Sequence, residues 1–140
     1  MGPILLQTPP KLEFEEEVAS GFFAMLRGVH AGPVGIEPRN ATWFGAAAED
    51  VLRRFDIARV AADPARVEGA GVPGGSGSFR YHRLHGSPRT YYSAYGEEML
   101  AATAEVLREE AQGGEVWCVF DNTASGAAAG NALRLRELVG

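Results

Sequence analysis

Apolar residues along this chain fall into two kinds of segment. Five short runs are apolar on nearly every residue, which is typical of parallel strands covered on both faces. The predicted strands are residues 3–7, 33–37, 57–63, 79–85 and 115–121. Between most of these runs, apolar residues recur every three or four positions, which is the spacing of an amphipathic helix. The pattern therefore predicts strands and helices in alternation.

Four helices are predicted from the second kind of segment. The first has a single apolar stripe, formed by Phe14, Val18, Phe22, Met25 and Val29. Glutamates in its first turn complement the positive end of the helix dipole. The other three helices cover residues 44–55, 97–112 and 123–139. On the third of the four helices, the face expected to point inward consists of Met99, Leu100, Thr103, Val106 and Leu107.

The order of these elements predicts an α/β fold with about five parallel strands and flanking helices, because strands and helices in alternation build parallel sheets through right-handed crossovers. The 140 residues predict a single domain, residues 1–140. A complete eight-stranded α/β barrel takes about 250 residues and is excluded. The glycine-rich stretch at residues 69–78 replaces one crossover helix, and we expect it to be a flexible surface loop.

Composition and charge narrow the range of partners. Hydrophobic residues make up 46% of the chain, enough for a packed core, and the net charge of −5 gives no overall basic field for nucleic acid. No apolar run reaches the roughly 18 residues that span a bilayer, and the first residues lack the pattern of a secretion leader. Cys118 is the only cysteine, so no internal disulfide is expected. We therefore expect a cytoplasmic protein without membrane contact.

Polar side chains stand at the end of every predicted strand. In chain order they are Gln7, Glu37 with Arg39, Asp63, Arg83 with His85, and Asp121 with Asn122. The carboxyl ends of parallel strands lie at one edge of a sheet, where α/β proteins bind their ligands. We therefore expect these residues, drawn from five separate segments, to form one polar pocket.

The residue types in this pocket suggest its chemistry. His85 is a candidate general acid or base, because imidazole exchanges protons near neutral pH. Glu37 and Asp63 are candidate catalytic bases or electrostatic groups, and Arg39 and Arg83 are candidate clamps for an anionic ligand. A metal site built from the carboxylates and the histidine is the alternative. Arginines at the same strand ends compete with a cation, so no metal or other cofactor is predicted.

Tyrosines follow the fourth predicted strand on the same side of the sheet. Tyr92 and Tyr95, with the neighbouring Tyr91, are candidates for stacking on a base or a sugar, and packing of the loop is the alternative. Gln7, Asp121 and Asn122 complete the predicted ligand-binding set.

Several segments together resemble the DUF72 (YecE-like) family. They are GPILLQTPP at residues 2–10, IEPRNATW at 36–43, RLHG at 83–86, YYSAY at 91–95, VFDNT at 119–123, and Gly126, Ala129, Asn131, Ala132 and Leu135 in the last helix. The resemblance implies a partial TIM-type (β/α) barrel with its amino-terminal strands missing. One departure is Asp121-Asn122, where the family usually has two asparagines, and it adds a charge to the pocket. The family brings no established activity.

These features lead to one functional prediction and its alternatives. We expect the pocket to bind a small anionic ligand that contains phosphate or sugar, and to hydrolyse it. The alternatives are a non-catalytic module for anions or nucleic acid, and an inactive truncated fragment. An incomplete barrel leaves sheet edges unpaired, so self-association through those open edges is also expected.

Overall fold

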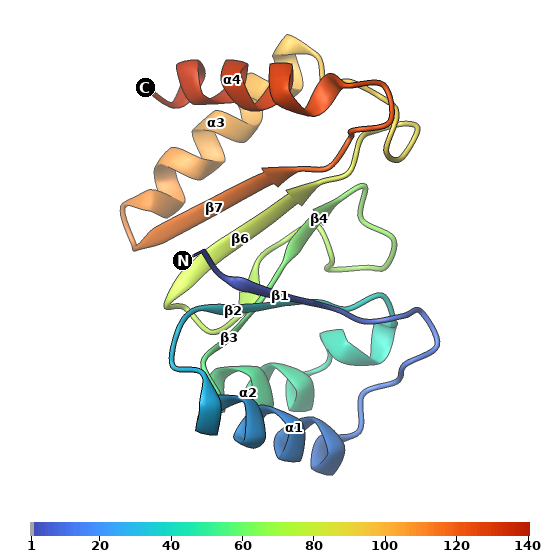
Figure 1. The fold of residues 1–140 in the computed structure, drawn as a ribbon, viewed down its shortest axis with the longest axis vertical. Coiled ribbons are helices and arrows are strands. Elements are labelled where there is room, and N and C mark those ends of the chain that lie inside the picture. The colour runs from blue at the N-terminus through green and yellow to red at the C-terminus, as the bar shows by residue number, and fades with distance from the viewer. Residues whose placement is uncertain (1) are drawn as a thin grey trace.

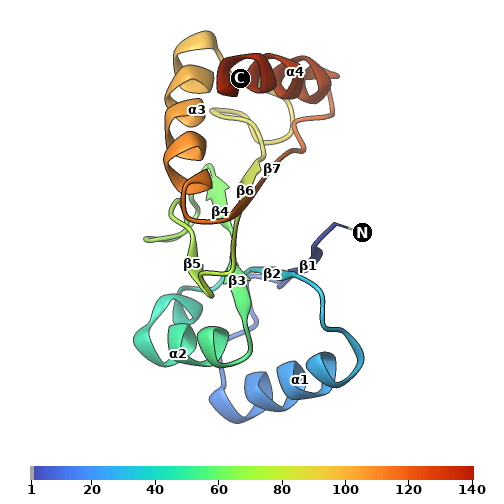
Figure 2. The same cartoon turned by 90° about the vertical axis from the view of Figure 1, so that its left-hand side faces the viewer.

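Two sheets run through the middle of the molecule, with helices on their outer sides (Figure 1). The computed structural model describes residues 2–140, and Met1, the first residue of the predicted domain, lies outside the described residues. Figure 2 shows α1 and α2 at one end and α3 and α4 at the other, with the strands between them. The elements are β1 (Ile4–Gln7), α1 (Glu16–Val29), β2 (Val34–Glu37), the 3₁₀ turn η1 (Ala41–Phe44), α2 (Ala46–Arg54), β3 (Ile57–Arg59), β4 (Ala61–Asp63), β5 (Gly74–Gly75), β6 (Phe79–Leu84), α3 (Glu97–Ala111), β7 (Glu115–Phe120) and α4 (Ala127–Val139).

The strand directions confirm the predicted parallel arrangement, with one addition. The first sheet has the order β1-β2-β3-β5 and the second has the order β4-β6-β7. All neighbours are parallel except β3 and β5, which are antiparallel. The pair β3–β5 was not predicted, because the two-residue strand β5 lies inside the glycine-rich stretch. Within residues 2–140, β1 pairs only with β2 and β7 only with β6, so the sheets do not close into a barrel.

The predicted strand at residues 57–63 is wrong as a single strand. It divides into β3 and β4, which belong to different sheets, and Val60 is the residue between them. The Val60 N–H still donates to the carbonyl of Ile36 in β2 at 2.8 Å. The chain thus passes from one sheet to the other within one extended segment, and this connection sets the two sheets next to each other.

Three apolar clusters hold these layers together. The first lies between α1, α2 and the first sheet, and includes Phe23, Ile36 and Leu52. The second lies between α3, α4 and the second sheet, and includes Leu100 and Leu135. The third joins the two sheets and consists of Ala58, Val60, Phe79 and Tyr81, with Leu5, Trp117 and Val119 packed against it. Burial of this apolar surface is the main stabilising contribution to the fold.

Two predicted helix faces differ from the structure. On α1, the side that packs inward carries Ala19 and Phe23, whereas the predicted stripe is solvent-exposed along most of its length. On α3, Leu100, Ala104 and Leu107 are buried, and Met99 and Val106 are exposed. Helical periodicity locates an apolar side of a helix, but it does not say which part of a wide apolar side meets the sheet.

The glycine-rich stretch is tied to the first sheet by polar contacts. Arg59 donates to the carbonyls of Gly69 at 3.1 Å and Val72 at 3.3 Å, and Glu49 accepts from the Gly75 N–H at 2.6 Å. Gly75 has φ of 68°, and a Cβ there would lie 2.4 Å from a backbone oxygen of β3. The flexibility of residues 69–78 stays a prediction. Across residues 2–140, no helix has both the length and the apolarity needed to cross a membrane.

Candidate functional site

Glu37, at the end of β2, is the centre of a polar cluster at the carboxyl ends of the strands. Its residue surface is 4% exposed. Oε2 accepts a hydrogen bond from Arg83 Nη1 at 2.5 Å. Oε1 accepts from Gln7 Nε2 at 3.2 Å and lies 3.1 Å from His85 Nε2. The ends of β1, β2 and β6 therefore meet at one carboxylate.

Asp121, which follows β7, closes this cluster into a ring. Arg83 Nη2 donates to Asp121 Oδ2 at 2.7 Å. His85 Nδ1 lies 2.7 Å from Asp121 Oδ1, close enough for an ion pair, although the ring N–H is not directed at this oxygen. Glu37, Arg83, Asp121 and His85 thus alternate as acidic and basic groups, and we call them the polar ring.

The charge state of Glu37 follows from its partners. Burial raises the pKa of Glu37, but the hydrogen bonds and charges of His85 and Arg83 outweigh burial and lower that pKa from 4.5 to about 2. Glu37 is therefore a carboxylate at neutral pH and has no proton to donate. Such a group holds Arg83 and His85 in place.

Two further arginines stand beside the polar ring. A cavity of about 20 Å³ is lined by Glu37, Arg39, Arg66 and His85 together with apolar residues. Arg39 Nε is 3.9 Å from Glu37 Oε1, which is too far for a hydrogen bond. Among residues 2–140, the one side-chain hydrogen bond of Arg66 runs from Nη2 to Thr90 Oγ1, at 3.4 Å. Arg66 was missed in the sequence, although it follows the end of β4 by three residues and the strand-end rule could have found it.

Buried polar atoms without a hydrogen-bond partner concentrate at this end of the molecule. Each such atom costs roughly 1–3 kcal/mol when it stays unpaired. Among residues 2–140, six of the eight belong to residues at strand ends, and the other two, on Ser20 and His30, lie elsewhere. The six are Thr8 Oγ1, Arg39 Nε, Arg83 Nε, His85 Nδ1, Asp121 Oδ1 and Asn122 Oδ1. A bound ligand with polar groups would therefore gain the most hydrogen bonds at the strand ends, because most of the unpaired buried atoms lie there.

The structure does not bring Asp63 into the polar ring. Its carboxylate Oδ2 accepts from the Tyr95 hydroxyl at 2.7 Å, and that hydroxyl accepts from the Gly86 N–H at 2.8 Å. Burial, together with the hydrogen bond to Asp63, raises the pKa of Tyr95 well above its ordinary value of 10. Asp63 and Tyr95 therefore act as a clasp between β4 and the loop after β6.

Asn122 and Tyr95 meet in a second network, around Asn131 of α4. The Asn131 side chain accepts from the Tyr95 N–H and donates to the Tyr95 carbonyl, both at 3.0 Å. Asn122 is fully buried and donates to Asn131 at 2.9 Å and to the Ser93 carbonyl at 2.9 Å. Asn131 was not among the predicted site residues, although a polar residue on the inward face of a helix was its signal. This network fixes the loop over the polar ring.

The remaining tyrosines border the polar ring from outside. The Tyr91 ring meets the His85 ring edge-on, with centroids 6.0 Å apart. Tyr91 has φ of 71°, a strained value for this residue type. Tyr92 is 46% exposed, and the Arg89 guanidinium lies 3.8 Å from its ring centroid. The structure therefore places Tyr92 at the rim of the cluster rather than inside it.

The carboxylates and the histidine at the strand ends are not arranged around a common point that a metal ion could occupy. Within the described residues 2–140, no group of three or more His, Cys, Asp or Glu side chains is arranged to hold one. Arg83 stands between Glu37 and Asp121, and Asp63 is turned towards Tyr95. The four residues of the metal alternative therefore do not converge on one point.

Comparisons with known proteins agree with this fold. A family model described as "Protein of unknown function DUF72" matches residues 1–140. The crystal structure of a DUF72 family protein from Thermotoga maritima MSB8 has 24% identity and a TM-score of 0.78, over 96% of this chain and 56% of that one. Two crystal structures of a DUF72 family protein from Enterococcus faecalis V583 have 19% and 21% identity and TM-scores of 0.78 and 0.77, over 98% of this chain and 58% and 60% of theirs.

The chain thus spans less than two thirds of the length of the solved chains that it resembles. No curated protein matched it. At these identities the structural likeness establishes the fold, and the family model establishes the relationship. This chain belongs to the DUF72 family.

Proposed function

We propose that the strand-end face binds a small anionic ligand that carries a phosphate group, such as a sugar phosphate. The observation that carries this proposal is the concentration of unpaired buried polar atoms around the polar ring, which include Nε of Arg39 and Nε of Arg83. A phosphate group offers several acceptor oxygens, and arginine binds such groups through parallel hydrogen bonds.

The charges around the small cavity favour an anion over a cation. Arg39, Arg66 and His85 face this cavity together with a single carboxylate, that of Glu37. Arg83 is already held by Glu37 and Asp121, so its charge is largely balanced. Arg39 and Arg66 make no ion pair within hydrogen-bond distance among residues 2–140, and they are the groups that would contact the ligand.

The wider fold supports the same location. In this proposal, the two sheets are a part of a TIM-type barrel, because their long strands run in one direction and the helices lie outside. The ligand sites of such barrels lie at the carboxyl ends of the strands. Glu37, Arg83 and Asp121 all lie at that end.

Hydrolysis of the ligand is the second candidate, and one observation favours it. His85 contacts two carboxylates, Glu37 through Nε2 and Asp121 through Nδ1, an arrangement that orients an acid–base histidine. Both ring nitrogens thereby face a carboxylate, so a reacting water would have to enter between His85 and one of these carboxylates. The geometry therefore supports binding better than catalysis.

The test is titration calorimetry with ribose 5-phosphate, with inorganic phosphate as a second probe. Arg39→Ala is expected to weaken binding of both at least about tenfold, because it removes one charged hydrogen-bond donor. Arg53→Ala is the matched control, since its exposed side chain pairs with Asp50 on α2. Equal losses in the two variants, or no binding to the unmodified chain, would refute the proposal.

A further inference from the structure

Tyr91, in the loop between β6 and α3, has a backbone conformation that is strained for its residue type. Its φ of 71° lies in the left-handed region, which a bulky aromatic residue seldom adopts. Asp56 is the one other non-glycine residue with positive φ among residues 2–140. Aspartate tolerates this conformation, and its carboxylate accepts a hydrogen bond from Ser76. Neither reason applies to Tyr91, and strained residues of this kind are concentrated at ligand sites.

Hydrogen bonds from neighbouring segments hold Tyr91 in this conformation. The Tyr91 N–H donates to the carbonyl of His85 at 2.5 Å. The Tyr91 carbonyl accepts from the N–H of Ala124, in the loop after β7, at 3.0 Å. Thr90, the residue before it, accepts from Arg66 at 3.4 Å. The backbone of Tyr91 is therefore fixed relative to the polar ring and to an arginine of the small cavity.

The side chain of Tyr91 is an open aromatic surface beside the polar ring. The residue is 40% exposed, and its ring stands at 90° to the His85 ring, with centroids 6.0 Å apart. Its neighbour Tyr92 differs, because the Arg89 guanidinium lies 3.8 Å from the Tyr92 ring centroid and covers one ring face. Among residues 2–140, no cation lies over the Tyr91 ring in this way. Tyr91 thus has ring surface available to a ligand.

We propose that Tyr91 stacks on a flat unsaturated ring of the ligand, so that the strand-end face prefers a nucleoside monophosphate to a simple sugar phosphate. This inference rests on the proposed function, because it takes the phosphate to lie beside Arg39 and Arg66. His85 lines the small cavity and also lies next to the Tyr91 ring. One sugar unit can therefore join a phosphate at the arginines to a base on Tyr91. Aromatic side chains stack on every base, because each base has a π face.

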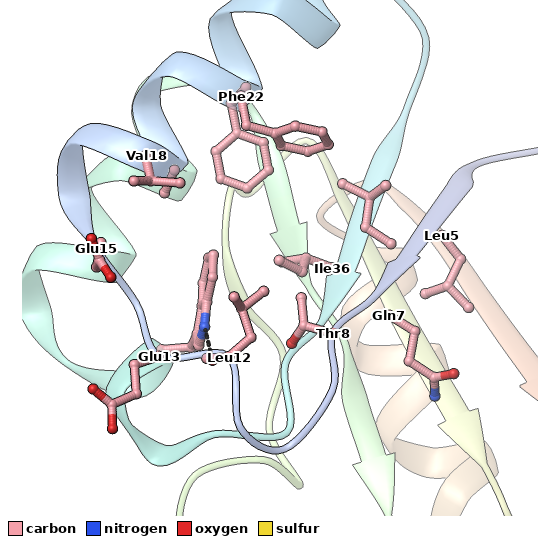
Figure 3. Close-up of a pocket in the computed structure, with 13 residues that line it drawn as sticks. Leu5, Gln7, Thr8, Leu12, Glu13, Glu15, Val18, Phe22 and Ile36 are labelled. Carbon is pink, nitrogen blue, oxygen red and sulfur yellow. Dashed lines mark hydrogen bonds between the residues drawn. The ribbon is translucent and has the colours of Figure 1, made fainter.

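A wider groove between α1 and β1 does not suit such a ligand. Its volume is about 440 Å³. In Figure 3, Val18 and Phe22 border the groove from α1. Glu13 and Glu15 stand at one end. Among residues 2–140, no arginine, lysine or histidine lines it, so a phosphate there would meet carboxylates without a balancing cation.

Titration calorimetry with adenosine monophosphate and ribose 5-phosphate tests this proposal, because the two compounds differ only in the base on the sugar. The unmodified chain should bind the nucleotide about tenfold more tightly, which is the size of effect that one stacked base provides. Tyr91→Gly should abolish this preference and leave the affinity for ribose 5-phosphate unchanged, because glycine adopts φ of 71° without strain and keeps the loop in place. Tyr91→Phe keeps the ring and should keep the preference.

Other results would overturn the proposal. Equal affinity of the unmodified chain for both compounds would remove the role of Tyr91 and leave the phosphate site standing. A preference that survives Tyr91→Gly would assign the base to another residue. Equal weakening of both compounds by Tyr91→Gly would show that Tyr91 positions the loop without contacting the base, and loss of the preference in Tyr91→Phe would assign it to the hydroxyl. Binding of neither compound would refute the proposed function itself.

Discussion

Glu37 gives the sharpest prediction about stability. Replacement Glu37→Gln keeps the shape of the side chain but removes the negative charge that holds Arg83 and His85. The wild-type carboxylate stabilises the folded state because its pKa is lower there than in the unfolded chain. We therefore expect the variant to be less stable at neutral pH.

The magnitude follows from the lowered pKa. A fall from 4.5 to about 2 corresponds to about 3 kcal/mol, at about 1.4 kcal/mol for each tenfold change in proton affinity. A lowered carboxyl pKa gives stability that is fully present above pH 4.5 and is lost as pH falls towards 2. About 2 kcal/mol of it should be gone at pH 3. The free energy of unfolding of the wild type should therefore exceed that of the variant by about 3 kcal/mol at pH 7 and by about 1 kcal/mol at pH 3.

Urea unfolding followed by tryptophan fluorescence measures this difference, because Trp43 and Trp117 lie in two separate apolar clusters. The free energy of unfolding is determined for both proteins at pH 7, 5, 4 and 3. Glu109→Gln, at an exposed residue of α3, is the matched control and should leave the free energy of unfolding at pH 7 nearly unchanged. If the gap between wild type and Glu37→Gln stays constant from pH 7 to pH 3, the lowered pKa and the stabilising role of Glu37 are both wrong.

Two further predictions concern the surroundings of the polar ring. Tyr95→Phe removes the hydrogen bond to Asp63 and leaves the backbone N–H of Gly86 unpaired. The free energy of unfolding should therefore fall by about 2 kcal/mol. Unchanged stability would show that these hydrogen bonds do not stabilise the fold. Burial raises the pKa of the Cys118 thiol from 9.0 to about 12, so its thiolate fraction at pH 8 is about a thousandfold lower than in unfolded chain. Iodoacetamide should alkylate the thiol of the native protein far more slowly than that of the denatured protein. Equal rates would show that the thiol is not buried in the native protein.

The strand positions could be predicted from the sequence because local pattern determines them. Buried parallel strands are apolar on consecutive residues, and their ends are marked by polar side chains such as Glu37 and Asp121. These signals lie within a few residues of one another. They predicted the shared direction of the strands and the edge at which the polar residues would meet.

The pairing inside the cluster could not be predicted in this way. β2 and β6 belong to different sheets, so the contact of Glu37 with Arg83 depends on how the sheets face each other. That arrangement depends on the passage of the chain at Val60, where the apolar pattern gives no sign of a break. Asp63 lies at a strand end like the others, yet its side chain turns to Tyr95.

The misassigned face of α1 has a similar cause. Val18 and Phe22 are next to Ala19 and Phe23 in the sequence, and both pairs recur at helical spacing. Periodicity gives larger weight to the larger residues, whereas the sheet packs against the pair that includes the small Ala19. The local pattern does not say which of the two apolar sides of α1 meets the sheet, because that depends on the elements that pack beside the helix.

Side chains from several strand ends form one anion site in the proposed function. Backbone and imidazole chemical shifts of the ¹⁵N-labelled chain, recorded during titration with ribose 5-phosphate, test it most directly. We predict saturable changes in chemical shift that are largest at Arg39, Arg66, His85 and Asp121. Changes concentrated in the groove beside α1, or no changes at these four residues, would contradict it.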